Sequence, residues 1–340
     1  MIFALLGWTG LPGTGAEKES PKGDVSPETE VRIESLDYGF TPMTTVPGAI
    51  VKTFRIPAPR SRIVSADGIT LARNRVGKRL VFSLADAASS ADTAVALVAG
   101  LRAKFDEQIS LLSVSEVEVR KHYEHRRWIP LAISPTLSAE ALAALNGAVP
   151  EGVSLQEVSV REYPEGELTA HLIGYTGVSL PDQHGPVARV EYAWPPTEGR
   201  AGMETILDEQ IRGNDGEVLR LYDAVGELRH QEVVRKAKPG NTLILSIHLG
   251  MQRLAREQLE RSGRPGAFVA VDADTGDILA MVSHPTFDPN LFEGGISTET
   301  FAALSEGKDA PLFDRAVAGA YPPGSTFKPF VALAGMEAGT

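Results

Sequence analysis

Short stretches in which apolar and polar residues alternate predict β-strands in the first part of the chain. They begin near Arg32, and the clearest is Ile50–Ile56. Two further β-prone runs within residues 59–74 flank Asp67-Gly68, a pair that favours a tight hairpin turn. The first part of the chain is therefore expected to be rich in β-structure.

Apolar residues at helical spacing predict three helices. The first covers residues 85–112, and the second begins after Ser138, whose hydroxyl is suited to cap a first turn. The third follows a strand predicted over residues 239–248 and carries apolar residues on one side. Beyond it, two β-rich arms flank Asp274-Thr-Gly276 and predict a hairpin over residues 266–283.

The start of the chain has a different character. Residues 9–30 are rich in Gly, Pro, Ser, Lys and Glu, so residues 1–30 are expected to form a flexible tail or linker. The apolar run over residues 1–8 is far shorter than the roughly 20 residues that cross a bilayer, and it lacks a basic start. We therefore expect no membrane anchor in this chain.

Composition narrows the classes of function. The 340 residues suffice for about two domains, and 33 Lys and Arg against 44 Asp and Glu give a net charge of −11. This acidity argues against nucleic acid as a partner, because nucleic-acid-binding proteins present a basic face. The chain has no Cys, which excludes disulfides and thiolate metal sites. We find no phosphate-binding glycine loop and no His cluster with metal-ligand spacing.

Ser325 and Lys328 are the candidate catalytic residues. They follow the turn Pro322-Pro-Gly324 and stand at the start of an apolar run. If Ser325 opens a helix, Lys328 lies one turn further on the same face, within reach of the serine hydroxyl. The positive end of the helix favours alkoxide character on the serine. A lysine with an ordinary pKa of about 10.4 is no base at neutral pH, so the site has to be desolvated or rich in cations.

By itself, Ser-x-x-Lys is also common on solvated helices, so the surrounding residues decide its interpretation. Tyr321-Pro-Pro-Gly-Ser-Thr-Phe-Lys-Pro329 closely resembles the active-site serine segment of penicillin-binding proteins. Arg161-x-Tyr-Pro164, His171-x-x-Gly-Tyr-x-Gly177 and Gly202-x-Glu204 extend the likeness. From about Arg32 to Thr340 the chain resembles class B penicillin-binding proteins, most closely their penicillin-binding protein 2 group.

This resemblance implies an α+β fold. An elongated, β-rich dimerisation or pedestal module is expected over residues 31–240. Residues 241–340 are expected to form the opening hairpin and active-site helix of a serine β-lactamase/transpeptidase-like domain. We interpret Glu204 as a structural carboxylate that binds backbone or an arginine, and His171 as an ordinary packed or surface histidine and not a catalyst.

The resemblance also implies a peptidoglycan D,D-transpeptidase that cross-links stem peptides through an acyl-serine intermediate. Ser325 would be the nucleophile, Lys328 its base, and β-lactams would acylate the same serine. No metal or organic cofactor is implied. Family members work at the periplasmic face of the inner membrane, and the implied partners are a membrane glycosyltransferase and rod-shape scaffold proteins.

The chain departs from the family pattern in several places. Ser61 replaces a Gly, and Ser246-Ile-His248 stands where Thr-x-Asp is usual. The family's Ser-x-Asn and Lys-Thr-Gly motifs do not occur before Thr340. We therefore expect a fragment that is inactive as given.

Two other interpretations of the chain differ in function. The chain could be a catalytically incompetent module that only binds partners of the elongation machinery. Class D β-lactamases and β-lactam sensors also carry Ser-x-x-Lys, but the module ahead of the second hairpin argues against both.

Overall fold

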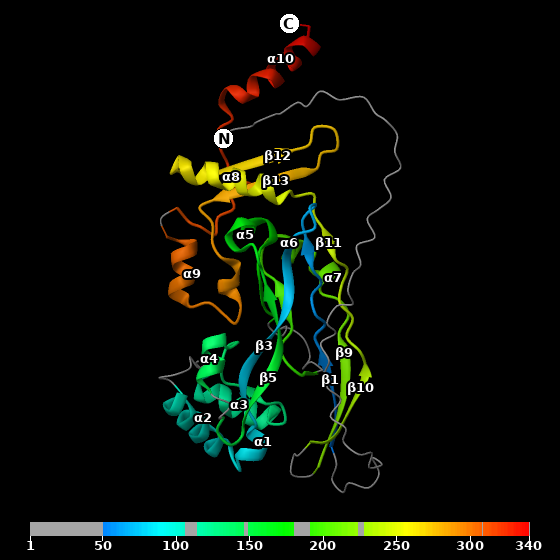
Figure 1. The fold of residues 1–340 in the computed structure, drawn as a ribbon, viewed down its shortest axis with the longest axis vertical. Coiled ribbons are helices and arrows are strands. Elements are labelled where there is room, and N and C mark those ends of the chain that lie inside the picture. Colours follow the sequence, from blue (N-terminus) through cyan, green and yellow to red (C-terminus); the bar gives the residue numbers. More distant parts are fainter. Residues whose placement is uncertain are drawn as a thin grey trace.

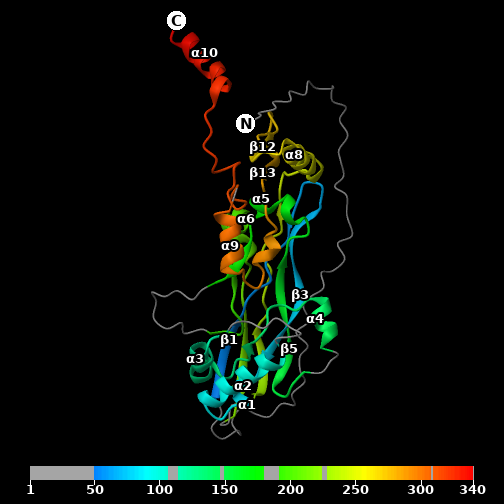
Figure 2. The same ribbon diagram turned by 90° about the vertical axis from the view of Figure 1, so that its left-hand side faces the viewer.

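The protein is elongated. The computed structural model describes residues 50–105, 114–145, 149–179, 191–223, 228–307 and 309–339. Small helices gather at one end, long strands run along the middle, and a hairpin with one helix lies at the other end (Figure 1, Figure 2). The predicted α+β character is confirmed. The predicted tail and the strands expected before Ile50 lie outside the described residues.

The longest structural unit is an antiparallel pair of strands, β3 (Thr70–Phe82) and β5 (Val153–Glu162). Their register is unbroken from Arg73 opposite Glu162 to Phe82 opposite Val153. Burial gathers at the two ends of β3, where Leu71 and Leu80 are buried, while Arg73 and Arg75 between them are exposed.

Three short strands complete this sheet: β2 (Ile63–Val64), β4 (Leu131–Ala132) and β11 (Leu243–Ile244). The predicted hairpin between β2 and β3 is confirmed, and Gly68 in its turn has φ +77°, which glycine adopts without strain. The strand predicted over residues 239–248 is reduced to β11. The reason is that β11 pairs only with β2, which is itself two residues long.

A second sheet lies beside the first and has the order β10-β9-β1-β7. Its strands are β1 (Ile50–Ile56), β7 (Glu191–Tyr192), β9 (Gly216–Tyr222) and β10 (Leu228–Arg235). The strand predicted at Ile50 is thus confirmed. Phe54 and Val218 form its core together with Trp128 and Trp194.

The helical end contains α1 (Leu84–Ala87), α2 (Ala91–Phe105), α3 (Glu116–Arg126) and α4 (Ala139–Ala144). The prediction of one helix over residues 85–112 was wrong within the described residues, since the chain leaves the helix at Ala88. The hydroxyl of Ser90 accepts a hydrogen bond from the amide of Thr93 and so starts α2 as a separate helix. The predicted cap at Ser138 is confirmed by its contact with the amide of Ala141.

The middle of the molecule holds small elements around one buried core. They are η1 (Gly166–Leu168), α5 (Ala170–Ile173), β6 (Thr176–Val178), β8 (Thr197–Gly199), α6 (Gly202–Ile206) and α7 (Asp208–Ile211). Gly174 ends α5 with φ +78°, and a Cβ there would lie 1.9 Å from the carbonyl oxygen of Ala201. Only glycine therefore lets α5 approach the start of α6.

The last part of the fold is built on α8 (Leu249–Ser262) and the hairpin of β12 (Gly266–Val271) and β13 (Ile278–His284). The predicted hairpin is confirmed, and the carboxylate of Asp272 accepts hydrogen bonds from two amides of its turn. Then follow η2 (Pro289–Phe292), α9 (Thr298–Ser305), η3 (Gly324–Phe327) and α10 (Lys328–Glu337).

The described residues up to Leu245 are called the pedestal, and those from Leu249 onward the catalytic part. Across the described ranges of both, no helix combines the length and the apolar character that crossing a membrane requires.

Candidate active site

The serine segment forms a 3₁₀ turn that continues into an α-helix. Gly324 has φ +55° and opens the 3₁₀ turn η3, which contains Ser325 and passes directly into α10 at Lys328. Residues three apart are eclipsed in a 3₁₀ turn, so Ser325 and Lys328 lie on the same side of the chain. Pro329 stands in the first turn of α10, where its missing N–H costs no hydrogen bond. Ser325 thus lies in a 3₁₀ turn ahead of the α-helix, not in the α-helix itself.

The surroundings of this segment are open. Ser325 and Lys328 are both exposed, and no hydrogen bond joins them among the residues that the structure describes. In both ribbon views α10 stands beyond the hairpin, away from the rest of the fold (Figure 1, Figure 2). The apolar side chains of η3 and α10 are exposed too: Phe327, Phe330, Val331, Leu333 and Met336. The described residues therefore do not supply the desolvated environment that a lysine base requires.

A buried cluster of charges lies in the pedestal and is centred on Glu204. This carboxylate is fully buried and accepts hydrogen bonds from Nε and Nη2 of Arg60 at 2.9 and 2.7 Å. It also accepts one from Nε of Arg161 at 2.7 Å, and Arg60 reaches Asp208 at 2.6 Å. The interpretation of Glu204 as a structural carboxylate is confirmed.

Ser61 adds a further hydrogen bond beside this cluster. Its hydroxyl donates to the carbonyl oxygen of Asn241 at 2.6 Å, and its amide donates to Ile211 at 2.8 Å. The side chain that replaces the family's glycine is therefore buried with its hydroxyl paired.

Asp67 caps α8 from a distant part of the chain. His248 is the N-cap residue of α8 but makes no side-chain cap. Instead, the amide of Leu249 donates to both carboxylate oxygens of Asp67, at 3.3 and 3.2 Å. Desolvation opposes the change, but hydrogen bonds from backbone amides and from Ser65 lower the pKa of Asp67 below its usual value. The first amide of α8 is thus capped by the β2–β3 turn and not by the side chain at position 248.

His171 is a packing residue, as predicted. Its Nε2 contacts the carbonyl oxygen of Pro311 at 2.7 Å, and its ring meets Phe287 edge to face at 5.2 Å. Since a carbonyl oxygen can only accept, Nε2 carries a proton. Burial lowers the pKa of His171, which keeps the ring neutral near neutral pH.

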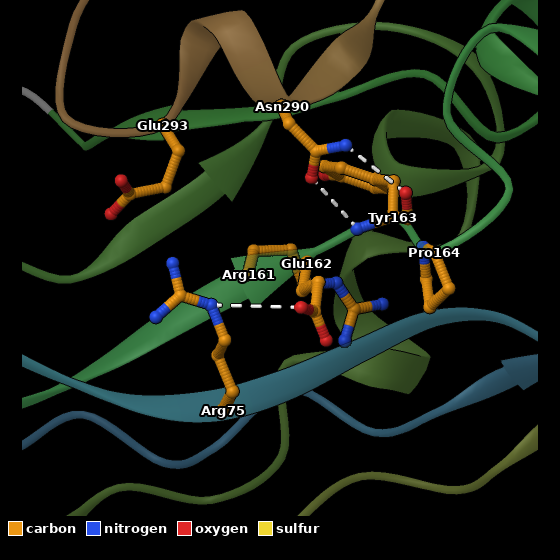
Figure 3. A pocket seen from close by; sticks show the side chains of 7 residues that line it. All are labelled: Arg75, Arg161, Glu162, Tyr163, Pro164, Asn290 and Glu293. Carbon is orange, nitrogen blue, oxygen red and sulfur yellow. Dashed lines mark hydrogen bonds and ion pairs between the residues drawn. The ribbon is translucent and has the colours of Figure 1, made fainter. Parts of the chain in front are cut away.

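A polar pocket of about 320 Å³ lies between the pedestal and the catalytic part (Figure 3). It is lined by Arg75, Arg161, Glu162, Tyr163, Pro164, Asn290 and Glu293. Glu293 accepts a hydrogen bond from Thr136 at 3.1 Å, and burial raises its pKa although two arginines act against this. Neither Asn290 nor Glu293 stands out in the sequence as a site residue. The only local signal is Asp288-Pro-Asn290, which is typical of a tight turn.

Two family descriptions match the chain. Residues 55–245 match the penicillin-binding protein dimerisation domain, and residues 266–340 match the penicillin-binding protein transpeptidase domain. The chain belongs to the penicillin-binding proteins. The described residues include no group of three or more His, Cys, Asp or Glu side chains that could hold a metal ion.

Curated penicillin-binding proteins align with much of this chain. The peptidoglycan D,D-transpeptidase MrdA of Acinetobacter baumannii is 39% identical over 193 residues, which cover 55% of this chain and 28% of that protein. MrdA of Escherichia coli K12 is 29% identical over 300 residues, covering 85% of this chain and 45% of MrdA. The chain thus spans less than half the length of these relatives.

Solved penicillin-binding proteins share the fold. PBP2 in its complex with MreC from Helicobacter pylori superposes with a TM-score of 0.65 at 22% identity, covering 85% of this chain and 52% of the other. PBP2 from the same organism without that partner gives a TM-score of 0.56 at 24% identity.

Proposed function

We propose that this chain carries the nucleophile and the base of a peptidoglycan D,D-transpeptidase, with Ser325 and Lys328 in these roles. One observation carries the proposal. In a member of the penicillin-binding protein family, Ser325 stands in a 3₁₀ turn and Lys328 follows on the same side as the first residue of α10.

In the proposed reaction Ser325 attacks the penultimate D-alanine carbonyl of a stem peptide. Its hydroxyl proton passes to the amine of Lys328 as the oxygen–carbon bond forms. The carbon–nitrogen bond to the terminal D-alanine then breaks, and that amine leaves with a proton. An amine of a neighbouring strand attacks the acyl-serine and forms the cross-link, which regenerates the serine. A β-lactam would acylate the same oxygen.

A lysine serves as a base near neutral pH only where it is desolvated or close to other cations. The exposed apolar residues of α10, such as Phe330 and Leu333, favour a further apolar surface against this helix. Such a surface would exclude water from Ser325 and Lys328.

The proposal includes a division of the chain and a setting in the cell. We propose a dimerisation domain over residues 31–240 and a transpeptidase domain over residues 241–340. The family matches to residues 55–245 and 266–340 support this division. We propose that the protein works at the periplasmic face of the inner membrane on peptidoglycan stem peptides. Rod-shape scaffold proteins and a membrane glycosyltransferase are its proposed partners, the former supported by the solved PBP2–MreC complex of a relative.

The alternative is a module that binds partners without catalysis. The observations in its favour are the exposure of both Ser325 and Lys328 and the buried cores that the pedestal forms by itself. Stem peptides would then not react with this chain.

Labelling with a fluorescent penicillin separates the two proposals. In the intact protein we expect one covalent label, which Ser325→Ala abolishes. Ser305→Ala, in which a serine of α9 is removed, is the matched control and should label as the wild type does. An unlabelled wild-type protein that still binds a scaffold partner would overturn the transpeptidase proposal and support the binding module.

A further inference from the structure

Asn290 of the catalytic part binds the backbone of Tyr163 in the pedestal at two points. Its Oδ1 accepts a hydrogen bond from the amide of Tyr163 at 2.9 Å, and its Nδ2 donates to the carbonyl oxygen of Tyr163 at 3.0 Å (Figure 3). The side-chain amide therefore pairs with the end of β5 as a neighbouring strand would.

Asn290 is itself held in orientation. Its amide nitrogen Nδ2 and its backbone N–H both donate to Oδ1 of Asp288, at 2.8 and 2.9 Å. Both bonds lie within the catalytic part, so they restrict the Asn290 side chain without help from Tyr163 and reduce the rotamer freedom that the contact costs. Asp288 and Asn290 together are called the clasp.

Tyr163, which the clasp binds, lies two residues after Arg161 of the buried charge cluster. Arg161 is bound to Glu204 and, through Nη1, to the carbonyl oxygen of Ser61 at 2.8 Å. Only Glu162 separates it from Tyr163 along β5. The end of β5 is thus anchored in the pedestal on one side and held by Asn290 on the other.

Apolar contacts also cross this seam between the pedestal and the catalytic part. Tyr175 stacks on Phe292 with ring centroids 3.6 Å apart, and Leu249 packs in the same core as Tyr163. The hydrophobic effect is non-directional, so such contacts hold the two parts together without defining an angle.

Hydrogen bonds are directional, so those at the seam can set the angle between the pedestal and the catalytic part. Beside the clasp the seam encloses the pocket of about 320 Å³, where Arg75 and Glu293 point toward the same space (Figure 3). Close packing does not fill this region.

Other directional contacts between the two parts lie along the same seam. Thr286 donates to the carbonyl of Glu167 at 2.9 Å, and Gln252 donates to that of Leu168 at 3.1 Å. Arg253 pairs with Glu165 at 2.9 Å, and the amide of Leu249 binds Asp67.

We propose that Asn290 is a positioning residue that sets the orientation of the catalytic part on the pedestal. It acts through its two hydrogen bonds to Tyr163. The orientation would affect the rate of cross-linking only if the proposed function holds. In that case the pedestal is fixed relative to the membrane, and its angle to the catalytic part decides whether Ser325 meets a polymeric substrate.

The chain lacks cysteine, so two spin labels can be placed without removing native residues. We choose Glu157→Cys on β5 and Glu257→Cys on α8, which are both exposed. Electron–electron resonance should give one narrow distance distribution in the otherwise unaltered protein. In some molecules the catalytic part is held on the pedestal, and in others the two parts have moved apart. Loss of two hydrogen bonds is expected to lower the ratio of the first to the second by about tenfold. Asn290→Ala should therefore at least double the width of the distribution.

Gln231→Ala is the matched control, because Gln231 accepts a hydrogen bond from Arg220 entirely within the pedestal. It should leave the distribution unchanged. If Asn290→Ala does not fold, Asn290→Asp is the second variant. It keeps the acceptor for the Tyr163 amide but sets a carboxylate oxygen against Asp288 and the carbonyl of Tyr163, so it should also broaden the distribution. Unchanged widths in the folded Asn290 variants would overturn the proposal.

Cross-linking of polymeric peptidoglycan by the intact protein gives a second measurement. It should fall about tenfold in Asn290→Ala and stay unchanged in Gln231→Ala. If the wild type is not acylated at Ser325, the proposed function fails while the distance measurement still tests the clasp. If Ser325 is acylated but Asn290→Ala cross-links as the wild type does, only the positioning role fails.

Discussion

The carboxylate of Glu204 on α6 accepts a 2.7 Å hydrogen bond from Nε of Arg161 on β5, and both side chains are buried. The same carboxylate binds Arg60, so one negative charge faces two guanidinium groups in the interior. A buried ion pair adds little stability compared with apolar packing, but removing one partner leaves the other charge uncompensated.

We therefore expect Glu204→Gln to lower the free energy of unfolding by about 3–5 kcal/mol, the usual cost of breaking a buried pair. Urea unfolding followed by circular dichroism measures this. The control is Glu257→Gln, since Glu257 forms an exposed pair with Arg261. That change should alter the free energy by about 0–1 kcal/mol. Equal effects of the two substitutions would contradict the assigned role of Glu204.

The stability lost when Asp67 no longer caps α8 should be restored by a capping residue at position 248. Asp67→Ala is expected to lower the free energy of unfolding by about 1 kcal/mol, because the amide of Leu249 loses its acceptor. His248→Asp would supply a carboxylate at the N-cap itself. The double variant should therefore recover most of the loss, whereas His248→Asp alone should add less because Asp67 already occupies the position. Strictly additive free energies would argue against a shared cap.

The burial of His171 predicts a pH dependence of stability. Its folded-state pKa lies below the usual value of about 6.5, so the unfolded chain binds the proton more readily. This contribution is fully present above pH 6.5 and is lost as the pH falls toward the folded-state pKa. Burial also lowers the pKa of His122, which therefore changes stability with pH in the same direction.

Thermal unfolding between pH 5 and 8 tests this dependence, with the melting temperature expected to drop on the acidic side. His171→Gln keeps a donor for Pro311 but removes the titrating ring, so the drop should become smaller. His125→Gln, at an exposed histidine of α3, should leave the pH profile as it is. A profile that does not change in His171→Gln would rule out this residue as a source of the acid sensitivity.

Lys328→Arg separates a proton-transfer role from an electrostatic one. Arginine keeps the charge and approximately the reach, but with a pKa above about 12 it cannot accept the serine proton. We expect acylation of the intact protein by penicillin to slow by about 10²–10⁴-fold, the usual contribution of a positioned base. Stopped-flow acylation rates measure this, with Ser325→Ala as the inactive reference. A rate within a few-fold of the wild type would show that Lys328 only provides charge.

Local sequence determined the elements whose signals lie within a few residues. Asp67-Gly68 and Asp274-Thr-Gly276 indicate their hairpins because backbone conformation at a turn depends on its own residues. The cap at Ser138 and the turn that brings Ser325 beside Lys328 follow for the same reason. Sequence also indicated that Glu204 is a structural carboxylate bound to backbone or to an arginine, since a buried carboxylate requires a partner.

Tertiary structure decided which distant residues meet. Arg60 lies 144 residues from Glu204, Asp67 lies 182 residues from the amide it caps, and Asn290 lies 127 residues from Tyr163. No local preference encodes such pairs. They form because the packed core desolvates polar groups, and a buried group without a partner costs more than the contact itself returns. The open surroundings of Ser325 and Lys328 were decided in the same way, because they follow from the position of α10 away from the rest of the described fold (Figure 1) and not from the four residues of the motif.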